Sequence, residues 1–353
     1  MNRIDVPLLL VLCTALLSGC RKDPALDEPS GPTPLTLQLP AWVPDSIGPA
    51  HEAEDNPLTV EGVALGRRLF HERALSDDHS LSCASCHRQE NAFTDPRRFS
   101  IGTDGSIGSR NAMAIVNLAW GEGFFWDGRR GSLEEQAHDP VTDMREMRNT
   151  WPVVEERLRA MPIYPPLFKA AFGTPDIDSL RVVAAIAQFE RTLISFDSRF
   201  DRYWYGGDTT VLDSIEKHGL FLYRGKGKCV RCHTLGNFTD EVIRNNGLDI
   251  QPADGGLGAH NGNPLDLGKF KTTTLRNIAV TAPYMHDGRF NNLLSVVQFY
   301  DGHVEHESPN VDTTMHRFPE GGVLTFEERA HLVAFLNTLT DEGFLTNPAH
   351  SAP

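Results

Sequence analysis

The sequence has few cysteines, no long apolar run and no excess of basic residues. There are six cysteines, four of which form two C-x-x-C pairs. The apolar run from Val6 to Leu17 is too short to span a bilayer. The net charge of −14 argues against nucleic acid as a partner. It favours a basic partner protein, although solubility alone explains it as well.

Long alternating patterns typical of β-strands are also lacking. Hydrophobic residues make up 40% of the 353 residues, which is enough for a sizeable core in one large domain or two. Apolar residues recur at helical spacing in several segments, so the sequence predicts a mostly α protein. These segments are 60–70, 132–137, 151–161, 179–195, 211–223, 293–300 and 325–339.

The N-terminal end is predicted to be a leader followed by a tether. Small residues before Cys20 mark a processing site, and residues 1–20 resemble a bacterial lipoprotein signal peptide. This resemblance implies cleavage before Cys20, lipidation of its thiol and export; an ordinary secretory leader is the alternative. Arg21, where some bacteria use Asp to retain a lipoprotein at the inner membrane, favours the outer membrane. Residues 21–56 are predicted to be a disordered tether that passes into an extended segment around Trp42.

Two pentapeptides, Cys83–His87 and Cys229–His233, share the pattern C-x-x-C-H. Two thiols three positions apart can reach both vinyl groups of one porphyrin, and the next imidazole can ligate its iron. A zinc site would need the two pairs about 15–20 residues apart, and a thioredoxin-like motif would need a βαβ context; neither explains the histidines. The sequence therefore predicts two covalently bound c-type haems. The attachment residues are Cys83, Cys86, Cys229 and Cys232, and the proximal iron ligands are His87 and His233.

Each haem motif follows an amphipathic helix, which indicates a duplicated plan without an evident sequence repeat. With four thiols assigned, and Cys13 and Cys20 in the leader, no pair remains for a structural disulfide. We predict two cytochrome-c-like haem domains with long connecting loops. The boundaries are 57–202 for the N-terminal domain and 203–345 for the C-terminal domain, with 203–207 as the linker.

Further motifs occur between and after the two pentapeptides: Arg110-Asn111, Phe125-Trp126-Asp127-Gly128-Arg129, Glu146-Met147 and Thr281-Ala282-Pro283-Tyr284. Together with the haem motifs, they resemble the bacterial dihaem cytochrome c peroxidases and their MauG-type relatives. The resemblance covers residues 57–340. It implies a peroxidatic first haem and an electron-transfer second haem. It also implies hydrogen peroxide as substrate, a small cytochrome or cupredoxin as electron donor, and a possible homodimer.

The resemblance assigns roles to residues near the first haem. Trp126 matches an inter-haem relay, which is needed because peroxide reduction takes two electrons whereas each iron supplies one; a space-filling aromatic is the alternative. Glu146 matches a distal acid/base that moves a proton during O–O cleavage, against the alternative of a surface charge. Gln136 and Pro140 match distal positions.

Calcium is the third cofactor that the resemblance implies. Asn111, with the main-chain carbonyls of Thr281 and Pro283, matches a calcium site between the haems. Hard oxygen ligands of this kind suit Ca²⁺. A simple loop cap at Asn111 is the alternative.

One departure from the peroxidase pattern concerns the first haem. Many dihaem peroxidases have a histidine eight residues before the asparagine, which closes the resting first haem. Here that position is Thr103, and no histidine occurs from 88 to 137. The first haem is therefore expected to be open at rest, with His79 as the alternative ligand.

The other departure concerns the second haem. Peroxidases have a methionine seventeen residues after the proline of T-A-P-Y, and here that residue is Tyr300, as in MauG-type proteins. A phenolate stabilises ferric iron and lowers the potential that a thioether would raise. Met285 and His303 remain alternative ligands.

Three functions follow. The first is a periplasmic, lipid-anchored cytochrome c peroxidase that reduces hydrogen peroxide at the first haem. The second is a MauG-type enzyme that oxidises a side chain of a partner protein, which an open first haem and Tyr300 favour. The third is a non-enzymatic electron carrier or sensor, against which Glu146 argues.

Overall fold

The computed structural model describes residues 31–43, 47–51, 53–315 and 322–353, and this part of the chain is mostly helical. Its named strands are β1 (Ile243–Arg244) and β2 (Phe270–Lys271), which pair antiparallel. The prediction of a mostly α fold is confirmed. Within the described ranges, no helix has the length and apolar character needed to cross a membrane. The predicted signal peptide, with Cys13 and Cys20, lies outside the described residues.

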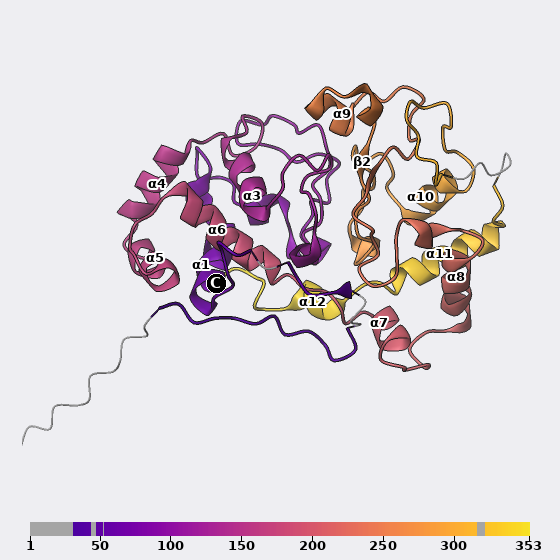
Figure 1. The fold of residues 1–353 in the computed structure, drawn as a ribbon, viewed down its shortest axis with the longest axis horizontal. Coiled ribbons are helices and arrows are strands. Elements are labelled where there is room, and N and C mark those ends of the chain that lie inside the picture. Colours follow the sequence, from indigo (N-terminus) through magenta and orange to yellow (C-terminus); the bar gives the residue numbers. More distant parts are fainter. Residues whose placement is uncertain (1–30, 44–46, 52, 316–321) are drawn as a thin grey trace, which may run out of the picture. The chain divides into compact units, whose positions relative to one another are not determined.

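The helices fall into two groups, which we call the first and second lobes (Figure 1). The first lobe contains α1 (Val60–Phe70), α2 (Cys83–Cys86), α3 (Leu133–Thr142), α4 (Trp151–Ala160), α5 (Tyr164–Phe172) and α6 (Ser179–Arg191). The second lobe contains α7 (Arg199–Trp204), α8 (Ser214–Arg224), α9 (Gly256–Asn261), α10 (Leu293–Tyr300) and α11 (Phe326–Asn337). The last helix, α12 (Glu342–Thr346), packs into the core of the first lobe.

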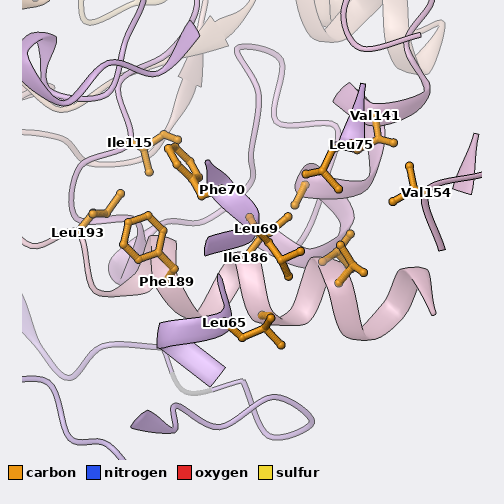
Figure 2. Close-up of a cluster of buried hydrophobic side chains, with 14 of the residues drawn as sticks. Leu65, Leu69, Phe70, Leu75, Ile115, Val141, Val154, Ile186, Phe189 and Leu193 are labelled. Atoms are coloured by element: carbon orange, nitrogen blue, oxygen red, sulfur yellow. The ribbon is translucent and has the colours of Figure 1, made fainter. Parts of the chain in front are cut away.

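The core of the first lobe is built on the packing of α1 against α6. Figure 2 shows Leu65 and Leu69 of α1 beside Ile186 and Phe189 of α6, and all four are buried. The backbones approach closely at Gly66, where a Cβ would lie 1.8 Å from the carbonyl oxygen of Ala185. Only glycine permits this approach, so the crossing of α1 and α6 depends on it.

The core of the second lobe uses the same device between α8 and α11. A Cβ on Gly219 of α8 would lie 2.0 Å from the carbonyl oxygen of His331 of α11. Leu220, Tyr223 and Phe335 fill the space around this contact. Both lobes therefore deliver their haem motifs from a helix pair in close backbone contact.

The C-terminal segment returns to the first lobe. Phe344 and Leu345 of α12 are buried in the core that contains Leu65 and Phe93, although the chain has by then built the second lobe. Residues 31–353 accordingly form one compact unit by backbone contacts. The boundaries 57–202 and 203–345 stay predictions, and this return crosses them.

The described part of the predicted tether lies against the body of the protein. The indole N–H of Trp42 donates to the carbonyl oxygen of Phe196 at 3.0 Å, and the N–H of Leu35 donates to that of Leu58 at 2.9 Å. Leu37, Val43 and Ile47 pack on a small cluster around Trp120 and Phe196. Residues 31–43 thus differ from a free tether, because apolar side chains anchor them.

The two lobes repeat one backbone plan at a constant spacing of 160 residues. Asn117 and Asn277 both adopt left-handed backbone angles, with φ of 56° and 59°, before a short helical turn. Ser132 and Asn292 cap the N-termini of α3 and α10. The same spacing relates Phe125 to Met285 and Gly128 to Gly288, all of positive φ. This register makes α3 and α10 counterparts.

Candidate haem pockets and active site

The first haem motif forms a short, capped helix at the edge of a cavity. Cys83–Cys86 is α2, and the side chains of Ser82 and Ser85 cap its N-terminus reciprocally. The Nδ1 atom of His87 lies 2.7 Å from the carbonyl oxygen of Phe93, which orients the ring and leaves Nε2 as the ligating atom. Burial lowers the pKa of His87, so the imidazole is neutral, as iron ligation requires.

The second haem motif has the same arrangement in a 3₁₀ turn, Cys229–Arg231. The Nδ1 atom of His233 lies 3.1 Å from the carbonyl oxygen of Phe238, and burial lowers the pKa of this histidine as well. Phe93 and Phe238 adopt left-handed φ angles of 59° and 54°, which turn their carbonyls toward the rings. Both motifs therefore fit proximal haem ligands.

The buried cysteines also fit thioether attachment. Burial raises the pKa of Cys83 far above its usual value and that of Cys229 to about 12. The pockets thus disfavour thiolates and accept uncharged sulfur. An apolar macrocycle joined through two thioethers suits this environment.

Each motif lines its own cavity. The first cavity, of about 890 Å³, is lined by Cys83, Cys86 and His87. The second cavity, of about 280 Å³, is lined by Cys229, Cys232 and His233. The first offers more free space.

The predicted distal residues gather on one side of the first cavity. Gln136 and Pro140, one helical turn apart on α3, and Glu146, in the following turn, all line it. The Glu146 side chain is accessible from the cavity. Surrounding protein raises its pKa to about 7, helped by the like charge of Asp143 and opposed by Arg129 and Arg145. Glu146 can therefore take up and release a proton near neutral pH.

Thr103 lies on a loop that packs against the Glu146 turn. Its N–H donates to the carbonyl oxygen of Glu146 at 3.0 Å, and its hydroxyl is buried without a partner among the described residues. His79 is exposed and does not line the first cavity. His260 does line it, from the exposed C-terminal end of α9. Sequence reasoning missed His260 because it comes from the other lobe.

Trp126 lines both cavities. Its indole N–H donates to the carbonyl oxygen of Asn111 at 2.8 Å. Its ring meets that of His286 edge to face, with centroids 6.4 Å apart, and His286 stacks on Phe270 at 3.8 Å. The predicted relay residue thus lies between the haem pockets and is fixed by contacts with the second lobe.

Two of the three candidate ligands for the second haem line the second cavity. The Tyr300 hydroxyl accepts a hydrogen bond from Nδ2 of Asn246 at 3.0 Å, and the same amide lies 3.9 Å from Sδ of Met285. Burial raises the pKa of Tyr300 to about 12. His303 is exposed, and its Nδ1 lies 2.9 Å from the carbonyl oxygen of Gln298. This places His303 away from the cavity.

The predicted calcium ligands share one cavity. Asn111, Thr281 and Pro283 all line the second cavity. The Nδ2 of Asn111 donates to the carbonyls of Arg97 and Arg98 at 3.1 and 3.2 Å, which turns Oδ1 away from them. An amide oxygen and main-chain carbonyls are the kinds of oxygen ligand that fit Ca²⁺.

Sequence reasoning assigned no role to three charged residues at the pockets. Glu190 of α6 lines the first cavity, its Oε2 is buried without a partner among the described residues, and burial raises its pKa to about 8. Lys271 of β2 lines both cavities. Arg110 joins the lobes by binding Asp127 and Asp254, each at 2.6 Å. A charge on an apolar helix face is the one signal that pointed to Glu190.

Comparison with known proteins agrees with this geometry. The family profile described as "Di-haem cytochrome c peroxidase" matches residues 60–210. The methylamine utilization protein MauG of Methylorubrum extorquens is 39% identical over 81% of this chain and 80% of its own length. The cytochrome c551 peroxidase of Nitrosomonas europaea is 34% identical over 81% of this chain and 82% of its own.

A solved structure of a MauG-like protein associated with microbial copper homeostasis is also similar. It superposes with a TM-score of 0.81 and 35% identity, covering 90% of this chain and 99% of its own. The expected fold of two cytochrome-c-like haem domains is confirmed. The chain belongs to the dihaem cytochrome c peroxidase/MauG family, which implies two c-type haems.

Proposed function

We propose that the protein is a periplasmic dihaem peroxidase that reduces hydrogen peroxide to water at the first cavity. The observation that carries this proposal is Glu146, a carboxyl with a pKa of about 7 facing the roomier cavity. The haems, when bound, supply the iron that binds peroxide and the electrons that reduce it. The residues of the chain supply the proton transfer, the orientation and the electron path.

Glu146 moves the proton that O–O cleavage requires. Reduction of one peroxide consumes two electrons and two protons and yields two water molecules. The carboxylate accepts a proton from one peroxide oxygen and returns it to the other, which leaves as water. Gln136 and Pro140 of α3 shape the space in which the peroxide is held.

Trp126 carries electrons between the two cavities, both of which it lines. An aromatic ring that is oxidised transiently shortens the distance of each electron step. Electrons enter through the second cavity from a small cytochrome or cupredoxin, and Tyr300 closes that cavity to peroxide. The two sites would thus have different tasks, since Glu146 lines the first cavity as a proton carrier and Tyr300 lines the second as a candidate iron ligand.

Steady-state turnover of hydrogen peroxide with a reduced small cytochrome c tests the proposal. We expect turnover by the wild-type protein and a loss of roughly 10²–10⁴-fold in Glu146→Gln. Glu156→Gln, at an exposed glutamate of α4, is the matched control and should leave turnover unchanged. Absence of turnover with any soluble donor would exclude this function.

A MauG-type oxidation of a partner protein is the second candidate. It is favoured by Tyr300 in the second cavity and by the similarity to a protein named for methylamine utilization. Peroxide would then be reduced with electrons from a side chain of the partner. Adding peroxide without a small donor and mapping oxidised residues in co-purified proteins by mass spectrometry tests this. An electron carrier or sensor would show neither reaction.

We further propose calcium between the lobes and a lipid anchor at Cys20. Asn111→Ala should lower the calcium content of the purified protein, measured by elemental analysis, because the amide oxygen is lost. Replacing Cys20 by Ala should move the protein from the outer-membrane fraction to the soluble periplasmic fraction. An unchanged fraction would refute the anchor and leave the haem proposals untouched.

A further inference from the structure

Lys271 of β2 is a buried cation between the two cavities, both of which it lines. Its side chain is only 5% exposed. Nζ donates to the carbonyl oxygen of Gly123 at 2.7 Å and pairs with Oε2 of Glu241 at 2.5 Å. The main-chain N–H of Lys271 donates to the carbonyl oxygen of Trp126 at 2.7 Å. One residue of the second lobe therefore holds the Trp126 loop at two points.

The 160-residue register gives this arrangement a counterpart. It relates Lys271 to Asn111 and Trp126 to His286. The N–H of Asn111 donates to the carbonyl oxygen of His286 at 2.7 Å, which mirrors the bond from Lys271 to Trp126. Each lobe thus holds the other's loop by an equivalent main-chain bond.

The correspondence between the two lobes extends beyond the main-chain bonds. The carbonyl of Pro283, a predicted calcium ligand together with Asn111, corresponds to the carbonyl of Gly123. The Lys271 ammonium binds that Gly123 carbonyl. Where Asn111 and the Pro283 carbonyl offer oxygen atoms to the proposed calcium ion, the equivalent place in the other half therefore carries a cation of its own.

We propose that Lys271 is a built-in cation that replaces a second metal ion and positions Trp126 between the cavities. It is a positioning residue, and the proposal rests on the proposed function insofar as Trp126 is the electron path. Glu241 balances the charge and also accepts the N–H of Glu122 at 2.9 Å, which ties the pair to the same loop. The aromatic ring of Phe124 lies 5.5 Å from Nζ and adds a cation–π contact.

Removing the charge has a predictable sign. Lys271→Met keeps the aliphatic stem but leaves Glu241 without its partner and adds net negative charge between the haems. Negative charge favours the oxidised, more positive iron, so both reduction potentials should fall. It also frees the Gly123 carbonyl, so electron redistribution between the haems should slow.

The test measures both haem potentials by spectroelectrochemical titration and the inter-haem electron redistribution rate by flash reduction. For Lys271→Met we expect both potentials to fall, at least one of them by about 59 mV, which is tenfold in the one-electron equilibrium. The redistribution rate should fall about tenfold or more. Lys269→Met is the control. Lys269 lies two residues before Lys271 and forms a similar ion pair with Asp266, so its replacement should change neither the potentials nor the rate.

A double variant separates charge from positioning. In Lys271→Met with Glu241→Gln the net charge is restored, so the potentials should return toward wild type while redistribution stays slow. Wild-type potentials and rate in folded Lys271→Met would overturn the proposal. Recovery of the rate in the double variant would overturn the positioning role. If Lys271→Met does not fold, Lys271→Arg, which keeps the charge, should keep the potentials but slow the rate; a wild-type rate would again overturn it.

A gain of metal tests the correspondence between the two lobes directly. Lys271→Asn copies Asn111 into the second lobe, beside the Gly123 carbonyl and the Glu241 carboxylate. It should bind one more calcium ion per chain than wild type, measured by elemental analysis after dialysis; no gain would overturn the idea that Lys271 replaces a metal. None of these measurements uses peroxide. If the potentials, the redistribution rate and the calcium content change as expected but the wild-type protein does not turn over peroxide, only the proposed function is refuted.

Discussion

Pro140 and Tyr300 are counterparts. They lie 160 residues apart at equivalent positions of α3 and α10, and each lines the cavity of its own lobe. Proline has no side-chain atom that can ligate iron, whereas tyrosine offers a phenolic oxygen. Two equivalent helices thus differ at one position: α3 adds no candidate iron ligand to its cavity there, and α10 adds one.

Tyr300→Phe should open the second site. The loss of the phenolic oxygen should convert a six-coordinate second haem into a high-spin one and raise its reduction potential, since an anionic oxygen ligand favours ferric iron. Electron paramagnetic resonance and redox titration measure both effects. Tyr284→Phe is the control, because Tyr284 lines the same cavity but its hydroxyl donates to the carbonyl of Ile278. Equal spectra for Tyr300→Phe and wild type would exclude Tyr300 as a ligand.

The pH dependence of peroxide turnover should report Glu146. Its base form must accept the first proton, so kcat/KM should rise with pH through about 7, the pKa to which the surrounding protein raises it. Glu146→Gln should abolish this limb. Asp143→Asn should move it to lower pH, because Asp143 is the like charge that raises the pKa. A limb that persists in Glu146→Gln would assign the proton transfer to another group.

Glu190 should make the folded protein less stable at alkaline pH. Burial raises its pKa from 4.5 to about 8, so between these values the folded state keeps a proton that the unfolded state has lost. Stability therefore falls as pH rises through this window, by on the order of 5 kcal/mol at most.

The measurement is urea unfolding at pH 5 and pH 9 for wild type, Glu190→Gln and the exposed control Glu156→Gln. Glu190→Gln should gain stability relative to wild type at pH 9 and much less at pH 5. The control should follow wild type at both values. A pH-independent difference would mean that Glu190 is ionised or already paired in the folded protein.

Trp126→Phe should slow electron redistribution between the haems about tenfold or more while leaving peroxide binding unchanged. Phenylalanine preserves the edge contact with His286 but is harder to oxidise and lacks the N–H that binds the carbonyl of Asn111. Trp120→Phe is the matched control, since Trp120 is buried in a separate small cluster. Flash reduction followed at haem wavelengths gives the rate. An unchanged rate would mean that electrons bypass Trp126.

The haem motifs and most helices could be predicted because their signals are local. Cys83–His87 fixes its chemistry within five residues, and the apolar face of α6 repeats at helical spacing. The predicted helix at 132–137 continues to Thr142, because Pro140 is tolerated inside α3. The local sequence pattern does not show that the turn of α3 before Pro140 already holds the backbone in helical geometry at this position.

The residues that sequence reasoning missed depend on contacts between distant segments. Lys271 gains its meaning from Gly123 and Glu241, and Arg110 from an aspartate 144 residues away. The constant 160-residue register was also missed, because aligned positions of the two halves carry different residues. Trp126 is aligned with His286, and Pro140 is aligned with Tyr300. The aligned residues have equivalent backbone conformations but different side chains. A comparison of residue identities therefore does not detect the duplication.

The return of α12 to the first core has a consequence for how the protein is made. Phe344 and Leu345 complete a core whose other members mostly precede residue 194. The first lobe therefore cannot complete its core until the second lobe has been synthesised in full. A chain that stops before Glu342 should lose order first around α1 and the first haem motif, because Phe344 and Leu345 would be missing from this core.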